Sequence, residues 1–112
     1  MLGEKLKELR ESNGLLQRQV AAELDVDTAY ISKMENNDKP VSKTNLSKLA
    51  QLYGVEEQEL LTLWLADKVY DVVKDQDVAL KAMEVVKEEI KEVQEYITKY
   101  DKTHSKTGHY TA

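Results

Sequence analysis

The sequence predicts an all-α protein, and three observations support this prediction. Apolar residues recur at steps of three and four along almost the whole chain of 112 residues, whereas strict alternation is nowhere sustained. The chain has four glycines, one proline and no phenylalanine, which argues against a turn-rich β-sandwich. Hydrophobic residues make up 41% and charged residues 33%, as in an ordinary globular chain. This length supports one compact domain, or a small domain with an extended arm.

The first two helices are expected at residues 2–12 and near residues 16–24. The first carries apolar residues on one face and charged residues on the other; its apolar residues are Leu2, Leu6 and Leu9. Asn13-Gly14 ends this helix, because either residue accepts the left-handed backbone that closes a helix. The second helix turns Val20, Ala21 and Leu24 inward.

A very short turn, Asp25-Val26, separates the second helix from the third. Asp27 is expected as the N-cap of a helix at residues 28–36, because its carboxylate can accept from the free amides of the next turn. Ile31 and Met34 form the buried pair of this helix. Two helices joined so briefly must cross steeply, as they do in a helix-turn-helix.

Two more helices follow a turn at residues 36–40. Ser42 or Thr44 opens the fourth, which ends at Gly54 and buries Leu46, Leu49, Ala50 and Leu52. The fifth begins near Glu56, with a break before Val73 left open, and carries Leu60, Leu61, Leu63, Trp64 and Val69.

The last helix is expected to start at Asp75-Gln76-Asp77 and to carry a heptad seam. Its apolar residues recur at steps of 4, 3, 4, 3, 4 and 3, namely Ala79, Met83, Val86, Ile90, Val93, Ile97 and Tyr100. The expected dimerisation residues are Met83, Val86, Ile90, Val93 and Ile97. The alternative is a helix that folds back onto its own bundle, since three heptads are short for a free coiled coil. We therefore divide the chain into a domain at 1–66, a helical dimerisation arm at 67–101 and a flexible tail at 102–112.

The window from Gln17 to Asn36 combines these features in register. Its positions 4, 8, 10, 15 and 18 are apolar and its fifth, Ala21, is small where the two helices meet. With Gly3-Glu4-Lys5-Leu6-Lys7-Glu8-Leu9-Arg10 before it, the chain resembles the lambda Cro/repressor-like helix-turn-helix family, of the xenobiotic-response-element type, from Leu2 to about Leu61. The resemblance implies a five-helix bundle that binds DNA as a dimer with its third helix in the major groove.

Three positions depart from the family pattern. Leu16 stands where the family usually has a capping Ser or Thr, and losing that cap costs about 1 kcal/mol. Asp25 and Asn37 stand where Gly is usual. Because Asp and Asn are the residues that best tolerate a left-handed backbone, both turns remain compatible with the fold.

The resemblance assigns base contacts to Thr28, Ala29 and Lys33. The methyl groups of the first two could meet thymine methyls, and the lysine could reach guanine O6 and N7. Gln17 and Asn36 match family positions that bind phosphate oxygens.

Other residues of this region have supporting roles. Tyr30 and Ser32 flank the base-contacting residues; we add Lys39 and Lys43 as charges beside the DNA backbone. Arg10 and Glu35 match a family pair that joins the first and third helices by a structural ion pair. The alternatives are that Thr28, Ser32 and the lysines form an ordinary solvated surface and that Tyr30 packs half-buried against the fourth helix.

The formal charge of −5 is unexpected for a protein that binds DNA. Residues 1–55 carry eight basic and eight acidic residues, whereas residues 56–112 carry eight lysines and thirteen acids. The acidity therefore lies in the C-terminal half, and residues 28–48 have a local charge of +2. Charge does not exclude DNA as the partner.

The function expected from these patterns is a homodimeric, sequence-specific regulator, most simply a repressor, on a pseudo-palindromic operator. A controller protein of a restriction–modification system is the alternative within the class. The alternative class is an interaction module or antitoxin whose acidic C-terminal helix binds a protein. We expect no enzyme activity, cofactor or metal site, because no catalytic constellation is present and His104 and His109 have no supporting carboxylates.

We expect a bacterial or phage protein that is located in the cytoplasm and associated with the nucleoid. The sequence has no cysteine, which suits a reducing compartment. The longest apolar run, at residues 60–66, is too short to span a membrane.

Overall fold

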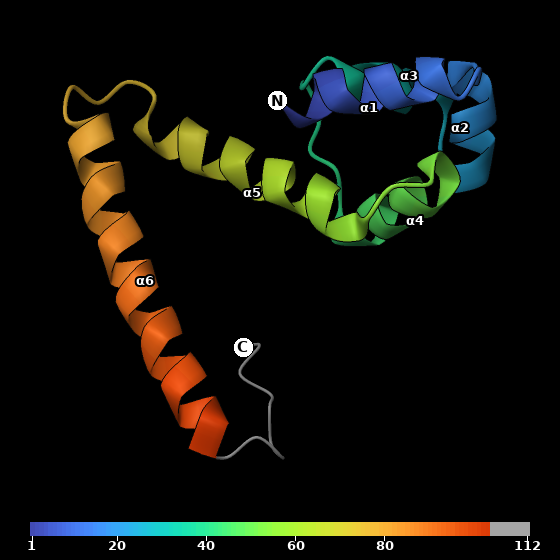
Figure 1. Cartoon of the computed structure of the whole chain (residues 1–112). Coiled ribbons are helices and arrows are strands. Elements are labelled where there is room, and N and C mark those ends of the chain that lie inside the picture. The colour runs from blue at the N-terminus through green and yellow to red at the C-terminus, as the bar shows by residue number, and fades with distance from the viewer. Residues whose placement is uncertain (104–112) are drawn as a thin grey trace. The chain divides into compact units, whose positions relative to one another are not determined.

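The structure is a computed structural model that describes residues 1–103, with side chains up to Tyr100. Within this range it has six helices and no strand (Figure 1), which confirms the all-α prediction. The helices are α1 (Leu2–Ser12), α2 (Gln17–Leu24), α3 (Thr28–Glu35), α4 (Lys43–Tyr53), α5 (Glu57–Val73) and α6 (Ala79–Thr103). None of these described helices is long and apolar enough to cross a membrane. Most of the expected tail, and both histidines, lie outside the described residues.

The chain divides into two units, of which the first is Met1–Val72 and the second begins at Val73. The first unit extends past the boundary expected at residue 66. Asp67 belongs to it, since its carboxylate accepts a hydrogen bond of 2.9 Å from the backbone N–H of Leu2 at the start of α1. The second unit contains α6.

The helix limits differ from expectation mainly in the C-terminal half. Ser42, and not Thr44, caps α4, as its hydroxyl oxygen accepts from the backbone N–H of Asn45 at 3.1 Å. The helix α5 runs without a break to Val73, because no glycine or proline interrupts it. The helix α6 starts at Ala79, after a turn at the expected start, and continues through residues 102 and 103 of the expected tail.

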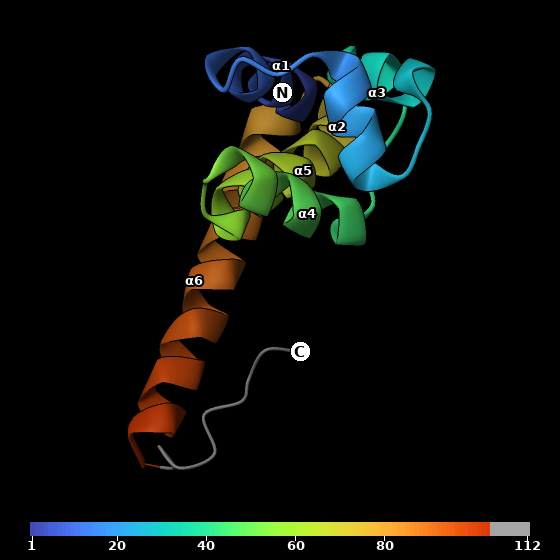
Figure 2. The ribbon, with the colours of Figure 1, turned by 90° about the vertical axis from the view of Figure 1, so that its right-hand side faces the viewer.

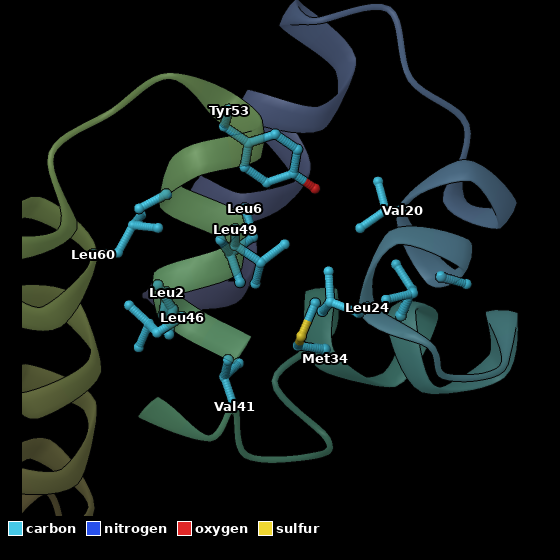
Figure 3. Packing of buried hydrophobic residues seen from close by; sticks show 13 residues of the cluster. Leu2, Leu6, Val20, Leu24, Met34, Val41, Leu46, Leu49, Tyr53 and Leu60 are labelled. Carbon is cyan, nitrogen blue, oxygen red and sulfur yellow. The ribbon is translucent and has the colours of Figure 1, made fainter. Parts of the chain in front are cut away.

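The core of the first unit lies between α1, α2, α3, α4 and the start of α5 (Figure 3). It includes the apolar pattern of the helix-turn-helix: Val20, Ala21, Leu24, Ile31 and Met34 are all buried. The helix α3 contacts both α1 and α2, and lies beside them in Figures 1 and 2. The core therefore holds α3 by one face and leaves its other face outside.

Two core residues were not expected from the sequence, namely Val41 and Tyr53. Tyr53 is 5% exposed, and its hydroxyl turns into the core (Figure 3), where it has no hydrogen-bond partner among the described residues. Burial raises the pKa of this phenol to about 12, because the charged form would lose its hydration.

Each of the first four helices ends in the same way. A residue just past the helix adopts a left-handed backbone, with φ of 67° at Gly14, 56° at Asp25, 63° at Asn37 and 67° at Gly54. Two backbone bonds then close the helix end; after α2 they run from Val26 N to Ala21 O at 3.0 Å and from Asp25 N to Ala22 O at 3.3 Å. This pair of bonds is the Schellman motif. The left-handed conformations inferred at Asp25 and Asn37 are thus confirmed.

The start of α1 meets the end of α3 at very short range. A Cβ atom on Gly3 would lie 2.5 Å from the carbonyl oxygen of Glu35, so only glycine fits there. The Gly3 N–H donates to Asn37 Oδ1 at 2.9 Å, and Asn37 Nδ2 donates to Glu4 Oε1 at 3.1 Å. The hydrogen bond from Asn37 is the main reason that the pKa of Glu4 is lowered to about 2. Asn37 therefore serves as a helix end and as a link between two helices.

Asp25 and Asn37 both have a left-handed backbone, but only the Asn37 side chain also bonds another helix, so the two positions make a matched test of that bridging role. Asp25→Gly should raise the free energy of unfolding by up to about 1 kcal/mol, because it removes left-handed strain and a negative charge from the C-terminus of α2. Asn37→Gly relieves the same strain but removes two side-chain hydrogen bonds, so stability should stay level or fall. Urea unfolding followed by circular dichroism measures both changes; an equal gain in the two variants would contradict the bridging role of Asn37.

Candidate nucleic-acid interface

The outer face of α3 carries the three residues expected to contact bases. Thr28, Ala29 and Lys33 are all exposed, whereas Ile31 and Met34 of the same helix are buried. Asp27 caps the helix, its Oδ1 accepting from the backbone N–H of Tyr30 at 2.8 Å. The first turn of α3 is therefore fixed, with small methyl-bearing side chains at its start and a cation one turn later.

Two flanking residues lie on the same helix or just past it. Ser32 is half-buried, and Asn36, the C-cap residue of α3, is exposed. Thr28, Ser32 and Asn36 are spaced four residues apart, so they follow one another along the helix surface. This spacing extends the polar face of α3 along its whole length.

A buried ion pair between Arg10 and Glu35 joins α1 to α3. The Arg10 Nε donates to Glu35 Oε2 at 2.7 Å and its second terminal nitrogen to Oε1 at 3.1 Å, in a two-point pair. The side chains are 10% and 2% exposed. The remaining terminal nitrogen of Arg10 donates to Leu15 O at 2.9 Å. Hydrogen bonding to Glu35 raises the pKa of Arg10, so the cation stays protonated. The expected ion pair is present.

Gln17 belongs to this buried group. Its Nε2 donates to Glu35 Oε1 at 3.1 Å, and the side chain is half-buried. One of the two amide hydrogens of Gln17 is therefore used in the bond to the Glu35 carboxylate. The other amide hydrogen and the carbonyl oxygen remain for a further contact. Sequence reasoning placed Gln17 at the phosphates and did not foresee this bond, which depends on where α3 presents Glu35.

The α3–α4 connection positions Tyr30 and the two added lysines. Tyr30 is half-buried beside the core, and its hydroxyl donates to Pro40 O at 2.8 Å. Lys39 and Lys43 are exposed. The ammonium of Lys43 lies 5.3 Å from the ring centroid of Trp64, so it rests on an aromatic face and is not a wholly mobile charge.

The first turn of α2 offers a cation and backbone amides that sequence reasoning overlooked. Arg18 is exposed there. Leu16 occupies the N-cap position and provides no side-chain acceptor; in the reverse direction Leu16 N donates to Gln19 Oε1 at 2.8 Å. The amides at a helix start that lack a capping side chain favour an anionic oxygen. The sequence signal for these free amides is the absence of Ser or Thr at the N-cap position, where Leu16 stands. At the level of the sequence, this absence predicts only a loss of helix stability.

The exposed surface of residues 28–48 is more positively charged than the number of basic and acidic residues in this stretch suggests. Four lysines stand there against Glu35 and Asp38. Since Glu35 is buried and neutralised by Arg10, Asp38 is the one acid of this stretch that faces solvent. The outer surface from α3 to α4 can therefore attract a polyanion even though the whole chain is acidic.

The heptad seam occupies one face of α6. Val86, Ile90 and Val93 are 47%, 49% and 54% exposed. Met83 and Ile97 are half-buried. Within the described part of the second unit α6 is the only helix, so nothing in that unit covers these side chains. Their role in dimerisation stays a prediction.

The first unit is the part of the chain that is similar to known proteins. A helix-turn-helix family matches residues 6–60. The control protein C.MunI of Mycoplasma sp is 41% identical over 54% of this chain and 82% of its own length. The control protein C.BamHI of Bacillus amyloliquefaciens is 32% identical over 54% of this chain and 76% of its own. A propionyl-CoA carboxylase regulator of Cereibacter sphaeroides is 45% identical, but the chain spans only 13% of its length. No solved structure matches the chain significantly.

The energetic weight of the ion pair can be tested by removing one or both partners. Arg10→Leu should lower the free energy of unfolding by about 3–5 kcal/mol, because it leaves the Glu35 carboxylate buried without its counter-charge. The double variant Arg10→Leu/Glu35→Leu should recover most of that loss, since no unpaired charge remains. Thermal and urea unfolding measure both; a double variant as unstable as the single one would contradict this assignment.

Proposed function

We propose that this chain, which belongs to the Cro/C1-type helix-turn-helix family of DNA-binding transcriptional regulators, acts as a homodimeric repressor on a pseudo-palindromic operator. The observation that carries the proposal is the exposed polar face of α3, opposite buried Ile31 and Met34. Blocking a promoter requires only that the protein occupy the duplex. The proposal therefore includes no catalytic activity and no cofactor.

In the proposed complex, α3 enters the major groove. Thr28 and Ala29 contact thymine methyl groups, and Lys33 donates to O6 and N7 of a guanine. These residues favour such a role because they are exposed together on a capped helix start.

Phosphate contacts flank this base readout. Gln17, Ser32 and Asn36 supply neutral donors beside α3, and Lys39 and Lys43 supply charge from the α3–α4 connection. To these we add Arg18, the exposed cation of the first turn of α2. Such contacts fix the register of the protein on the duplex but carry no sequence information.

We further propose that two chains pair through the seam of α6. Exposed apolar side chains at heptad spacing are removed from water when a second helix covers them. Two α3 helices related by a two-fold axis would then read half-sites about one helical turn apart. The acidic C-terminal half would stay away from the phosphates, and the protein would act in the cytoplasm, on the nucleoid of a bacterium or on phage DNA.

Two other functions have specific support. A controller protein of a restriction–modification system is favoured by the likeness to two control proteins over most of their length. An antitoxin or interaction module, the alternative class, is favoured by the acidic residues of the C-terminal half, which suit a basic protein partner. Selection of duplexes from a random pool at fixed salt separates the classes, because an interaction module would enrich no sequence.

Base readout and phosphate contact are separated by two substitutions. Lys33→Ala should cost about 1–3 kcal/mol of binding free energy on the selected duplex and relax discrimination at one or two positions of each half-site. Gln17→Ala should weaken all duplexes alike. Fluorescence anisotropy with the selected and an unrelated duplex measures both. The groove assignment is wrong if the two variants bind as the wild type does and differ only in melting temperature.

The role of α6 is tested by truncation after Asp75. The remaining chain keeps the whole first unit, so it should fold as a monomer. Its affinity for a duplex with two half-sites should fall to that for one half-site, because the two reading heads are no longer linked. Sedimentation and anisotropy give the two quantities. A truncated chain that still dimerises would show that the interface lies in the first unit.

A further inference from the structure

The connection between α3 and α4 is held at two successive carbonyl groups. Pro40 O accepts from the Tyr30 hydroxyl at 2.8 Å, and Val41 O accepts from the indole Nε1–H of Trp64 at 2.7 Å. The two donors come from α3 and from α5. The Val41 side chain is buried in the core. A short segment is thus fixed from both sides, by helices that are otherwise separated by α4 in sequence.

This anchored segment lies between the proposed phosphate-binding lysines. Lys39 precedes it directly, and Lys43, the first residue of α4, follows it after the Ser42 cap. The backbone positions of both lysines are therefore set by where the two carbonyls are held. An unanchored loop would have to be ordered when DNA binds, at a cost in conformational entropy.

Trp64 also contacts one of the lysines through its ring. The Lys43 ammonium lies 5.3 Å from the ring centroid, and that of Lys68 lies 4.4 Å from it. Attraction between an ammonium and an aromatic face keeps the cation near the ring while leaving it accessible to solvent. One side chain of α5 therefore constrains both the backbone before α4 and the side chain that begins it.

We propose that Trp64 is a positioning residue for DNA binding, which holds residues 39–43 so that Lys39 and Lys43 are aligned with phosphates beside the groove occupied by α3. This proposal rests on the proposed function. Trp64 itself does not touch the DNA. Its part is to order the segment in the free protein, so that binding does not have to order it.

Packing alone does not account for the contacts of Trp64. The residue is half-buried and only borders the core, and a phenylalanine would supply apolar area at the same place. What tryptophan adds is an N–H group directed at a loop carbonyl. The polar contact and the ring contact both point to the same five residues.

The test compares Trp64→Phe with the wild type on a duplex selected by the wild type from a random pool and on an unrelated duplex. Removal of the anchor should weaken binding to both duplexes by about fivefold, the equivalent of one neutral hydrogen bond. The slope of log affinity against log salt should fall by about one for each phosphate that the variant no longer neutralises. Lys68→Ala is the matched control; it removes the other cation from the ring, leaves the indole N–H in place, and should bind as the wild type does.

A double-mutant cycle shows whether Trp64 acts through the lysines. Trp64→Phe should have no further effect in a Lys39→Ala/Lys43→Ala background, and its full effect in a Lys33→Ala background. Should Trp64→Phe fail to fold, the single tryptophan can be replaced throughout the chain by benzothienylalanine. That residue keeps the ring shape and has sulfur in place of the N–H group, and the same weakening is expected.

The outcomes separate this proposal from the function on which it rests. If the wild type selects no duplex, the proposed function fails and this proposal fails with it. If Lys33 matters but Trp64→Phe keeps the wild-type affinity and salt slope, only the positioning role is overturned. An equal weakening in both lysine backgrounds with an unchanged salt slope also overturns it, because that pattern indicates a general structural role.

Discussion

The orientation of α3 depends on one buried ion pair. Arg10 reaches from α1 to the carboxylate of Glu35 on α3, and also to Leu15 O in the turn between α1 and α2, while Gln17 brings α2 to the same carboxylate. Removing two charges from water is unfavourable, and only close geometry with further hydrogen bonds offsets it. Here both carboxylate oxygens are engaged. The helices α1, α2 and α3 are therefore joined at the Glu35 carboxylate. This junction fixes which face of α3 is turned outward.

The sequence predicted what local chemistry determines. The helix α1 begins and ends at the expected residues, Asp27 caps α3, and Asp25 takes the left-handed backbone inferred for it, because these features depend on neighbours in the chain. The apolar positions of α2 and α3 were predictable for the same reason, since helical periodicity alone selects their buried face.

What could not be predicted depends on contacts between distant segments. The pattern around Gln17 does not show that its amide meets Glu35, and the pattern around Lys43 does not show that its ammonium lies against a ring on α5. Val41 is not among the core residues that the apolar spacing predicts, yet it is buried. The first unit extends past residue 66, and nothing near Asp67 in sequence shows that this residue meets the start of α1. The pairs Gln17–Glu35, Lys43–Trp64 and Leu2–Asp67 are each separated by more than fifteen residues in the sequence.

Trp64 gives the protein a built-in optical probe. Because it is the only tryptophan in the sequence, all of the indole emission of the chain comes from one place. That place is where α5 meets the α3–α4 connection, with the indole N–H on a backbone carbonyl and two ammonium groups near the ring. Indole emission responds to hydrogen bonding and to nearby charge. The tryptophan emission of the unlabelled protein, excited at a wavelength that tyrosine does not absorb, therefore reports the state of this junction.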